Sequence, residues 1–363
     1  MEKKPVTPLP AAEAPVTSPG PSPVRSRRKS GGLTLSDVAR IADVAPITAS
    51  RALKSPDLVS PAVLQRVRDA VEKTGYVPNL LAGGLASTKS KLVAAVVPTI
   101  TGAVFLEMVQ SLTASLAASG YQLMLGQSGY ENSREDALLE AIIGRRPDGV
   151  VLTGIMRSAL AKRRLQVSGI PVVETWDLTS TPIDMLVGFS HEKIGVAVAE
   201  FLHARGRRKV ATISANDDRA VRRNKAFSDT ALSLGMLDAD SPEVPTCIVP
   251  APTTLGSGRS GLRSLLQDHP NIDAIFCSSD MLALGVLTEA QAMGIAVPEK
   301  LAVIGLGDLS FSCDLNPALT TVRIDGSAIG AIAADFIIQR AEGKVISDPI
   351  RDIGFSIIER DST

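Results

Sequence analysis

Ten short aliphatic runs, separated by stretches with the apolar periodicity of helices, fill the chain from residue 92 onward. Runs such as KLVAAVVP, GVVLTG and LAVIGLG are bounded by Pro or Gly, as in strands that are covered on both faces. Strands that alternate with helices predict parallel sheets with crossover helices, the α/β class. The predicted strands are 92–97, 121–126, 149–153, 171–175, 185–189, 209–214, 245–249, 273–277, 301–305 and 319–323.

Ten strands exceed one comfortable sheet, so the pattern favours two doubly wound subdomains with a cleft between them. The 363-residue length suggests two or three domains, and with only 3% aromatic residues their cores must be mostly aliphatic. The first core subdomain is expected at 91–188 and 320–346, and the second at 189–319 and 347–363.

A compact helical unit is expected ahead of this core, at residues 33–78. Its predicted helices are 35–42, 46–53 and 61–74; Ser60 and Pro61 mark the beginning of the last helix and Gly75 its end. Residues 1–32 are rich in Pro, Ser, Ala and Gly and predict a disordered leader. Its basic stretch RSRRK suits either a solvated tail or a weak phosphate-binding arm, and residues 79–90, with two adjacent glycines, predict a linker.

Charge is unevenly distributed although the whole chain is neutral. Residues 25–91 contain twelve Lys or Arg and five Asp or Glu, so this stretch is positive and the remainder of the chain is negative. The front of the chain is therefore the natural partner of a polyanion such as nucleic acid.

The first two predicted helices have the proportions of a helix-turn-helix, in which the second helix presents its N-terminal residues to the major groove. Small apolar residues supply the inward face, namely Leu35, Val38, Ala39, Ala42, Val44, Ala49 and Leu53. The outward positions of the second helix are Pro46, Ile47, Thr48, Ser50 and Arg51. A plain helical bundle is the alternative, and the basic context favours DNA binding.

Other function classes find little support. Three Cys and three His are scattered without metal-ligand spacing, so no metal or cofactor is expected, and no nucleophile has a nearby histidine. Two glycine-containing stretches, GLGD at 305–308 and GSGRSG at 256–261, do not match a complete nucleotide-binding motif. Both are interpreted as loops, and the second is expected to precede a helix that begins near Arg259. The protein is therefore not expected to be an enzyme. Without a secretory leader or an 18-residue apolar run, a cytoplasmic protein without membrane contact is expected, which disfavours an exported solute-binding protein.

TLSDVARIADVAPITASRAL, followed by VS and GYVPN, resembles the lactose-repressor family of bacterial transcription regulators. The likeness extends from residue 34 to about 360, and it implies a DNA-binding headpiece and a core similar to periplasmic sugar-binding proteins. It also implies that the headpiece contacts DNA through Thr34, Pro46, Ile47, Thr48, Ser50 and Arg51. Two residues depart from the family pattern: Asp43 stands where Gly or Asn is frequent, and Ala45 replaces a Ser that could cap the second helix.

The segment NLLAGGLAS resembles the family's hinge, which becomes helical when two copies meet in the minor groove. The resemblance places Asn79, Ala82 and Leu85 on DNA, with Leu85 as the apolar wedge. A flexible linker is the alternative. The resemblance also implies a homodimer on a pseudo-palindromic operator, and the absence of a leucine-heptad tail after DIGFSIIERD favours a dimer over a tetramer.

Matching positions in the core imply a small-molecule effector in the cleft. The implied contacts are Phe105, Tyr130, Thr153, Trp176, Arg223, Ser279 and Asp308. Many sugar-binding relatives have aspartates where this chain has Trp176 and Gly307, and here Asp177 and Asp308 each stand one place later. Fewer carboxylates in the cleft, together with Arg223, favour an anionic ligand.

SGYENSRED, GIPVVETWD and FCSSDMLALG resemble the gluconate-operon repressor branch of the family. The hypothesis is a repressor of sugar-acid utilisation genes whose operator binding is relieved by gluconate or 2-ketogluconate. A regulator of neutral sugars or nucleosides, or an activator, is the alternative.

Overall fold

The computed structural model describes residues 33–77, 89–100, 103–129, 132–237 and 242–363. They belong to two units, Met1–Gly83 and Gly84–Thr363, called here the headpiece and the core. The disordered leader predicted at 1–32 lies outside the described residues, and so do residues 79–88 of the hinge predicted at 79–90.

The headpiece consists of three α-helices and one 3₁₀ turn. The elements are α1 (Leu35–Ile41), α2 (Pro46–Lys54), η1 (Pro56–Leu58) and α3 (Pro61–Thr74), so the predicted helices are confirmed to within one residue. Val38, Ala39, Ala42 and Ala49 are buried among them, as the inward face requires. The small size of these side chains lets the short helices approach closely.

Two backbone positions shape the headpiece. Asp43 has a φ of 52°, so it adopts the left-handed turn conformation that relatives assign to Gly or Asn. Gly75, at a φ of 64°, ends α3 in the same conformation. Ser60 stands at the N-cap of α3, but its side chain accepts no hydrogen bond there, so Pro61 with its preset φ defines the beginning of the helix.

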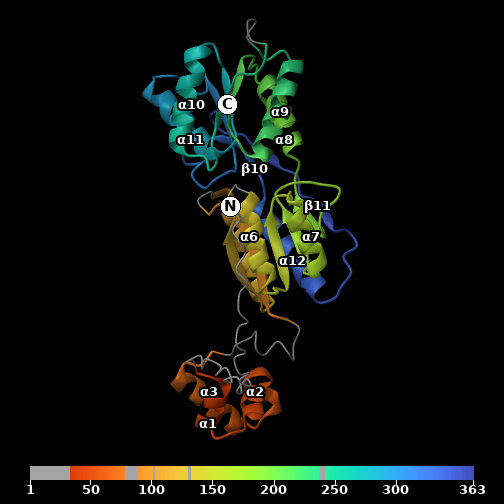
Figure 1. The fold of residues 1–363 in the computed structure, drawn as a ribbon. Coiled ribbons are helices and arrows are strands. Elements are labelled where there is room, and N and C mark those ends of the chain that lie inside the picture. Colours follow the sequence, from red (N-terminus) through yellow and green to blue (C-terminus); the bar gives the residue numbers. More distant parts are fainter. Residues whose placement is uncertain (1–32, 78–88, 101–102, 130–131, 238–241) are drawn as a thin grey trace, which may run out of the picture. The chain divides into compact units, whose positions relative to one another are not determined.

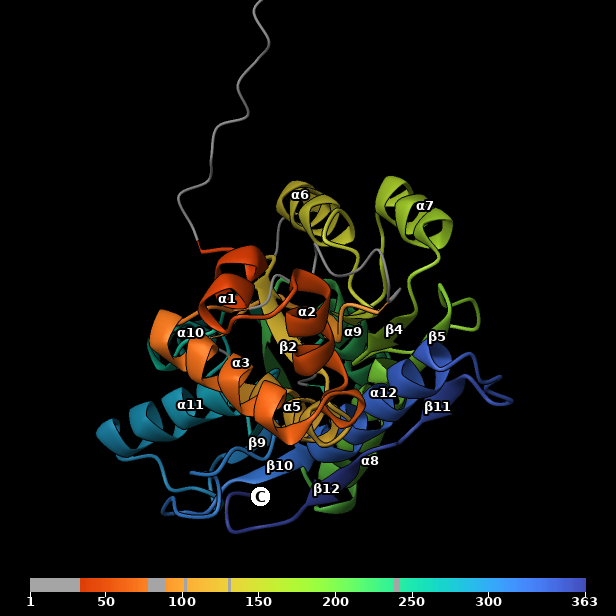
Figure 2. The same ribbon diagram turned by 90° about the horizontal axis from the view of Figure 1, so that it is seen from below.

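The first core subdomain has a six-stranded parallel sheet in the order β11-β5-β4-β3-β1-β2. Its strands are β1 (Leu92–Val97), β2 (Gln122–Gln127), β3 (Gly149–Thr153), β4 (Val172–Thr175), β5 (Met185–Gly188) and β11 (Ile350–Asp352). Its helices are η2 (Ala103–Phe105), α5 (Leu106–Ala118), α6 (Asn132–Ile143), α7 (Ala159–Ser168) and α12 (Gly326–Ala341). Figure 2 shows α6 and α7 on one side of β4 and β5, and α12 on the other.

The second core subdomain repeats this plan in the order β12-β10-β9-β8-β6-β7, with β12 antiparallel to β10. Its strands are β6 (Val210–Ala215), β7 (Thr246–Val249), β8 (Ala274–Cys277), β9 (Ala302–Leu306), β10 (Thr320–Arg323) and β12 (Ser356–Ile358). Its helices are α8 (His191–Ala204), α9 (Asp218–Ser233), α10 (Leu255–Asp268) and α11 (Asp280–Ala292). Within the core, Figure 1 shows α8, α9, α10 and α11 in one half and α6, α7 and α12 in the other.

All ten predicted strands are present, and the strand pairing corrects the subdomain boundaries. Thr320–Arg323, expected in the first subdomain, pairs with β9 in the second sheet, whereas Ile350–Asp352, expected in the second, pairs with β5 in the first. The chain therefore crosses between subdomains three times, after β5, β10 and β11. The two short final strands fell below the apolar length that marks a buried strand.

The interpretation of GSGRSG as a loop was wrong, because residues 256–261 lie inside α10. A Cβ on Gly258 would lie 2.2 Å from the carbonyl oxygen of Leu282, and one on Gly285 would lie 2.2 Å from that of Leu255. The glycines let α10 and α11 cross backbone against backbone. They serve helix packing and not phosphate binding.

Candidate functional site

The N-terminus of α1 is closed by Thr34, the first of the predicted DNA contacts. The Thr34 hydroxyl donates to Oδ2 of Asp37 at 2.7 Å, while the Thr34 N–H donates to the same oxygen at 3.0 Å and the Asp37 N–H donates back to Oγ1 of Thr34. These hydrogen bonds hold the pKa of Asp37 below its usual range. Thr34 is thus a capping residue whose exposed position still permits a contact with DNA.

The second helix presents the predicted reading face. Pro46, Ile47 and Arg51 are exposed, Ile47 to 70%, and Thr48 and Ser50 are partly exposed. Ala45, at the N-cap, offers no side-chain acceptor, so it makes no capping hydrogen bond to the first N–H groups of this helix. The structure therefore brings five of the predicted DNA contacts to one helix, and Asn79, Ala82 and Leu85 lie outside the described residues.

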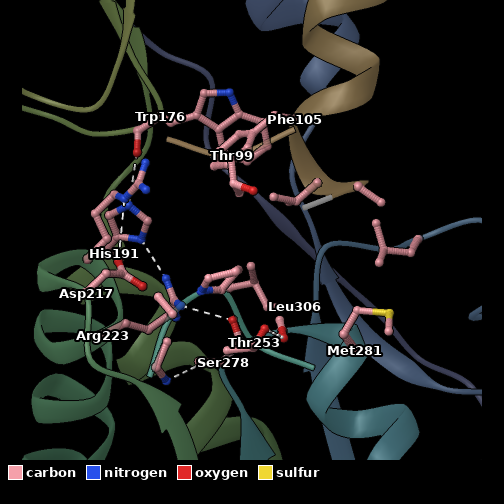
Figure 3. A pocket seen from close by; sticks show the side chains of 18 of the residues that line it. Thr99, Phe105, Trp176, His191, Asp217, Arg223, Thr253, Ser278, Met281 and Leu306 are labelled. Carbon is pink, nitrogen blue, oxygen red and sulfur yellow. Dashed lines mark hydrogen bonds and ion pairs between the residues drawn. The ribbon is translucent and has the colours of Figure 1, made fainter. Parts of the chain in front are cut away.

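A cavity of about 130 Å³, called here the apolar compartment, opens between the two core subdomains (Figure 3). Four of the predicted effector residues, Phe105, Trp176, Arg223 and Ser279, line it. They come from η2, the segment after β4, α9 and the N-cap of α11. The structure thus unites residues that are as far as 174 positions apart in the sequence.

Arg223 is the buried cation of this compartment, with 5% of its surface exposed. Nη1 lies 2.9 Å from Nδ1 of His191, and Nη2 donates to the carbonyl oxygen of Ser278 at 3.2 Å. Nε is buried without a partner among the described residues. Burial lowers the pKa of Arg223 to about 10, because the charged guanidinium loses its hydration inside the protein. A bound anion would stabilise this charge.

His191 orients the guanidinium. Nε2 of His191 lies 3.0 Å from the carbonyl oxygen of Trp176, which can only accept, so Nε2 carries the proton and Nδ1 accepts from Arg223. Gly195 of α8 makes the contact possible, because a Cβ there would lie 2.3 Å from the carbonyl oxygen of Arg223. Burial first, and then the charge of Arg223, lower the pKa of His191 to about 2, so the imidazole is neutral.

Three aromatic side chains form one wall of the compartment. The rings of Phe105 and Trp176 meet edge to face at 5.0 Å, and those of Trp176 and Phe189 at 5.7 Å. Trp176 has a φ of 63°, and its Nε1 donates to Sδ of Met108, which fixes the indole. An apolar wall beside a buried cation suits a ligand with both a C–H face and a charge.

Hydroxyl groups also line this compartment, and Figure 3 shows Thr99 beside Phe105 and Trp176. Oγ1 of Thr253 lies 2.8 Å from Oγ of Ser279, and Thr99 and Ser278 also line the compartment. Sequence reasoning did not select Thr99, His191, Asp217, Arg219 or Thr253. Three of them could have been found, since Thr99, Asp217 and Arg219 follow the carboxyl ends of β1 and β6, where ligands bind in parallel sheets.

A second cavity of about 250 Å³, the polar compartment, shares Asp217 and Arg219 with the first. Thr153 lies here and not among the residues that line the apolar compartment. Ion pairs join the subdomains around it, Arg157 with Asp218 and Arg222 with Asp177. Asp177, one place after Trp176, therefore presents a carboxylate that already has a cationic partner, while burial raises the pKa of Glu135 nearby.

Asp308 lines neither compartment. Its carboxylate accepts from Arg360 at 2.7 Å and from Arg323 at 3.4 Å, which joins β10 to the end of the chain. The observed contacts of the Asp308 carboxylate are therefore with these two arginines, and its expected contact with the effector stays a prediction. Tyr130 lies outside the described residues.

None of the described helices combines the length and apolar character needed to cross a lipid bilayer. Among the same residues, no three His, Cys, Asp or Glu side chains gather as metal ligands would.

Comparisons with known proteins bear on both units. Residues 34–79 match the family model "Bacterial regulatory proteins, lacI family", and residues 199–363 match "Periplasmic binding protein-like domain". The HTH-type transcriptional regulator GntR of Pseudomonas aeruginosa is 37% identical over 93% of this chain and 98% of its own length.

Solved structures agree with the sequence relatives. A LacI family transcriptional regulator from Silicibacter pomeroyi superposes with a TM-score of 0.84 at 29% identity, covering 91% of this chain and 99% of its own. The lac repressor dimer bound to operator and an anti-inducer shares the fold at 20% identity, with a TM-score of 0.76 over 92% of this chain and 99% of its own. The chain is a member of the lacI family of bacterial regulatory proteins, and it is a DNA-binding transcriptional repressor and not an enzyme.

Proposed function

We propose that this repressor senses a sugar acid, gluconate or 2-ketogluconate, in the apolar compartment, and that the bound acid relieves operator binding. The observation that carries the proposal is the buried guanidinium of Arg223, whose described hydrogen bonds go to an uncharged imidazole and a carbonyl. Its planar fork suits a carboxylate. Similarity to regulators named GntR supports the same ligand class.

The remaining lining suits the rest of such a ligand. The Trp176 and Phe105 rings offer an apolar face to the carbon chain, and the hydroxyls of Thr253 and Ser279 can exchange hydrogen bonds with its hydroxyl groups. Asp177 is engaged by Arg222, and Asp308 by Arg360, so neither brings an uncompensated carboxylate to the ligand. The lining thus favours one acidic group on a polyhydroxylated chain.

Relief of repression requires that the acid bind more tightly to the state that does not bind DNA, since equal affinity for both states would shift nothing. The compartment is formed by both subdomains, so a ligand that contacts Phe105 and Arg223 together changes the free energy of their relative orientation. We propose a homodimer as the acting form, as in the lac repressor dimer on its operator. Leu85 is the proposed minor-groove wedge.

Isothermal titration with gluconate, 2-ketogluconate, glucose and ribose tests the ligand class. Arg223→Ala is expected to weaken acid binding at least about 100-fold, because it removes two charge-assisted hydrogen bonds. Lys225→Ala removes the same charge from an exposed position on α9, so it should leave the affinity unchanged. Tight binding of a neutral sugar alone would overturn the sugar-acid proposal.

A gel-shift series with the promoter next to the protein's own gene tests relief by the ligand. Each sugar acid should release the parent protein from this DNA, whereas Arg223→Ala should stay bound. Leu85→Ser should weaken DNA binding and keep the affinity for the acid. If both substitutions impaired both activities equally, the proposed division between headpiece, hinge and core would be wrong.

A further inference from the structure

The side-chain carboxylate of Asp148 binds the backbone at the beginning of the core. The Ser90 and Lys91 N–H groups donate to the two oxygens of Asp148 at 3.0 and 2.7 Å, and the Asp148 N–H donates to the carbonyl oxygen of Leu92 at 2.7 Å. These residues, Ser90, Lys91, Leu92 and Asp148, are called here the entry corner. Lys91 has a φ of 54°, a left-handed conformation that is unfavourable for lysine, so the carboxylate holds a bend that the chain would otherwise avoid.

The entry corner is attached to the middle of the first sheet. Asp148 immediately precedes β3, which lies between β1 and β4. Gly149 lets β3 pack closely against α12, because a Cβ at this position would lie 2.5 Å from the Ile337 side chain. A movement of β3 must therefore move the entry corner with it, since interiors are close-packed and transmit displacement.

The opposite end of β3 reaches the contact between the two core subdomains. Thr153 and Gly154 line the polar compartment, and Arg157, shortly after them, forms an ion pair with Asp218 of the other subdomain. One short strand therefore connects the place where the subdomains meet to the place where the chain arrives from the DNA-binding headpiece.

The second subdomain has a similar arrangement, although neither Arg208 nor Lys209 has a positive φ. The Arg208 and Lys209 N–H groups donate to the two oxygens of Asp273 at 2.8 and 3.0 Å, and the Asp273 N–H donates to the carbonyl oxygen of Lys209 at 2.9 Å. Asp273 is half-buried, as Asp148 is, and it also immediately precedes a central strand, β8. The segment that it holds follows α8 inside the core and does not lead to the headpiece.

We infer that Asp148 is a positioning residue for operator binding, because it fixes the point and direction in which the chain leaves the core toward the headpiece. Its counterpart, Asp273, performs a similar structural task without that consequence. The inference rests on the DNA-binding role of the chain, and its link to the effector through β3 rests on the proposed function.

The test compares Asp148→Asn with Asp273→Asn in the full-length protein. Each substitution replaces one carboxylate acceptor by an amide donor at a similar corner, so both should lower the melting temperature by similar amounts. The probe is a duplex that the parent protein selects from a random-sequence pool, and affinity is measured by fluorescence anisotropy without effector. Asp148→Asn should weaken duplex binding about tenfold or more, and Asp273→Asn less than twofold.

Amide hydrogen exchange measures directly whether the hydrogen bonds of the entry corner are lost. The Ser90 and Lys91 amides should exchange faster in Asp148→Asn and as in the parent in Asp273→Asn. Faster exchange with unchanged duplex affinity would overturn the inference, and so would equal losses of affinity in the two variants. If Asp148→Asn did not fold, Ser90→Ala would replace it. This substitution removes the hydroxyl that accepts a hydrogen bond from the Leu92 N–H at 3.2 Å. It should weaken duplex binding about tenfold or more, whereas Asp273→Asn should weaken it less than twofold.

Titration with gluconate separates this inference from the proposed function. Both variants should bind gluconate as the parent does, but the acid should release the duplex less completely from Asp148→Asn. If gluconate bound to none of the proteins, the effector proposal would fail, and the anisotropy comparison without effector would still decide the role of Asp148.

Discussion

Protonation of His191 should destabilise the fold, because the ring is buried and its Nδ1 can accept a hydrogen bond from Arg223 only in the neutral form. His191 is 3% exposed, Nε2 donates to the Trp176 carbonyl, and Nδ1 accepts from Arg223. A second proton would remove that acceptor and place a positive charge against the guanidinium. Burial first, and then the charge of Arg223, lower the pKa of His191 from 6.5 to about 2 in the folded protein.

The sign and size of the effect follow from proton linkage. Because the unfolded chain binds the proton more readily than the folded protein, stability is complete above the unfolded pKa of 6.5 and is lost as the pH falls toward about 2. Between pH 7.5 and pH 5.0 this single group should remove about 2 kcal/mol from the free energy of unfolding. The loss should continue to grow below pH 5.

His191→Gln replaces the imidazole by an amide that can donate to Trp176 and accept from Arg223 without titrating. Urea unfolding of the parent and the variant at pH 7.5 and 5.0 gives the difference in pH dependence, from which any constant cost of the substitution cancels. The variant should lose about 2 kcal/mol less than the parent over this range. His203→Gln, at the partly exposed far end of α8, should keep the parent's pH dependence. Parallel stability curves for the parent and His191→Gln would refute the assignment of a neutral, buried His191.

Three further predictions concern packing and capping. Ala45→Ser should supply the missing N-cap acceptor of α2 and stabilise the headpiece by about 1 kcal/mol, seen as a higher melting temperature; an unchanged or lower value would contradict this. Gly258→Ala should destabilise the core by about 1–3 kcal/mol in urea unfolding, because the new Cβ would meet the Leu282 carbonyl. Gly256→Ala on the same helix should be neutral or stabilising, because its Cβ would lie 3.8 Å from the nearest atom. Equal effects of the two substitutions would argue against the close helix crossing. Asp308→Asn should lower stability by about 1–3 kcal/mol, since Arg360 loses its carboxylate partner, and should leave gluconate affinity unchanged; weaker binding at full stability would return Asp308 to the effector site.

Local signals in the sequence predicted the elements well. Pro46 and Pro61 begin helices, Gly75 ends one, and the aliphatic runs bounded by Pro or Gly became ten strands. Such features depend on interactions between residues close in the sequence, so periodicity and capping chemistry suffice to find them. The same reasoning missed β11 and β12, which are short edge strands defined by pairing with distant partners.

The site was predicted less completely, because its members owe their positions to long-range packing. Phe105, Trp176, Arg223 and Ser279 were identified by resemblance and do meet in one cavity. His191 stood in the sequence as an isolated histidine, and its role depends on the approach of α8 to α9 at Gly195, which no local pattern shows. Asp308 does not line that cavity, and its ion-pair partner Arg360 lies 52 residues away, so no local pattern shows this contact either.

The charges of the two compartments together restrict the ligand beyond its class. The charged groups that line the apolar compartment are Arg219 and Arg223 against Asp217, since His191 is neutral, so one net positive charge faces the ligand. Around the adjoining polar compartment, Arg157, Arg219 and Arg222 already pair with Asp218, Asp217 and Asp177, and burial raises the pKa of Glu135, so a second acidic group of the ligand would find no unpaired cation among the described residues that line it. A six-carbon acid with one terminal carboxylate should therefore bind, while the corresponding acid with a carboxylate at each end should bind at least about tenfold more weakly, a difference of about 1.4 kcal/mol. Competition calorimetry with gluconate and glucarate measures this ratio, and equal affinities would mean that the polar compartment does not contact the ligand.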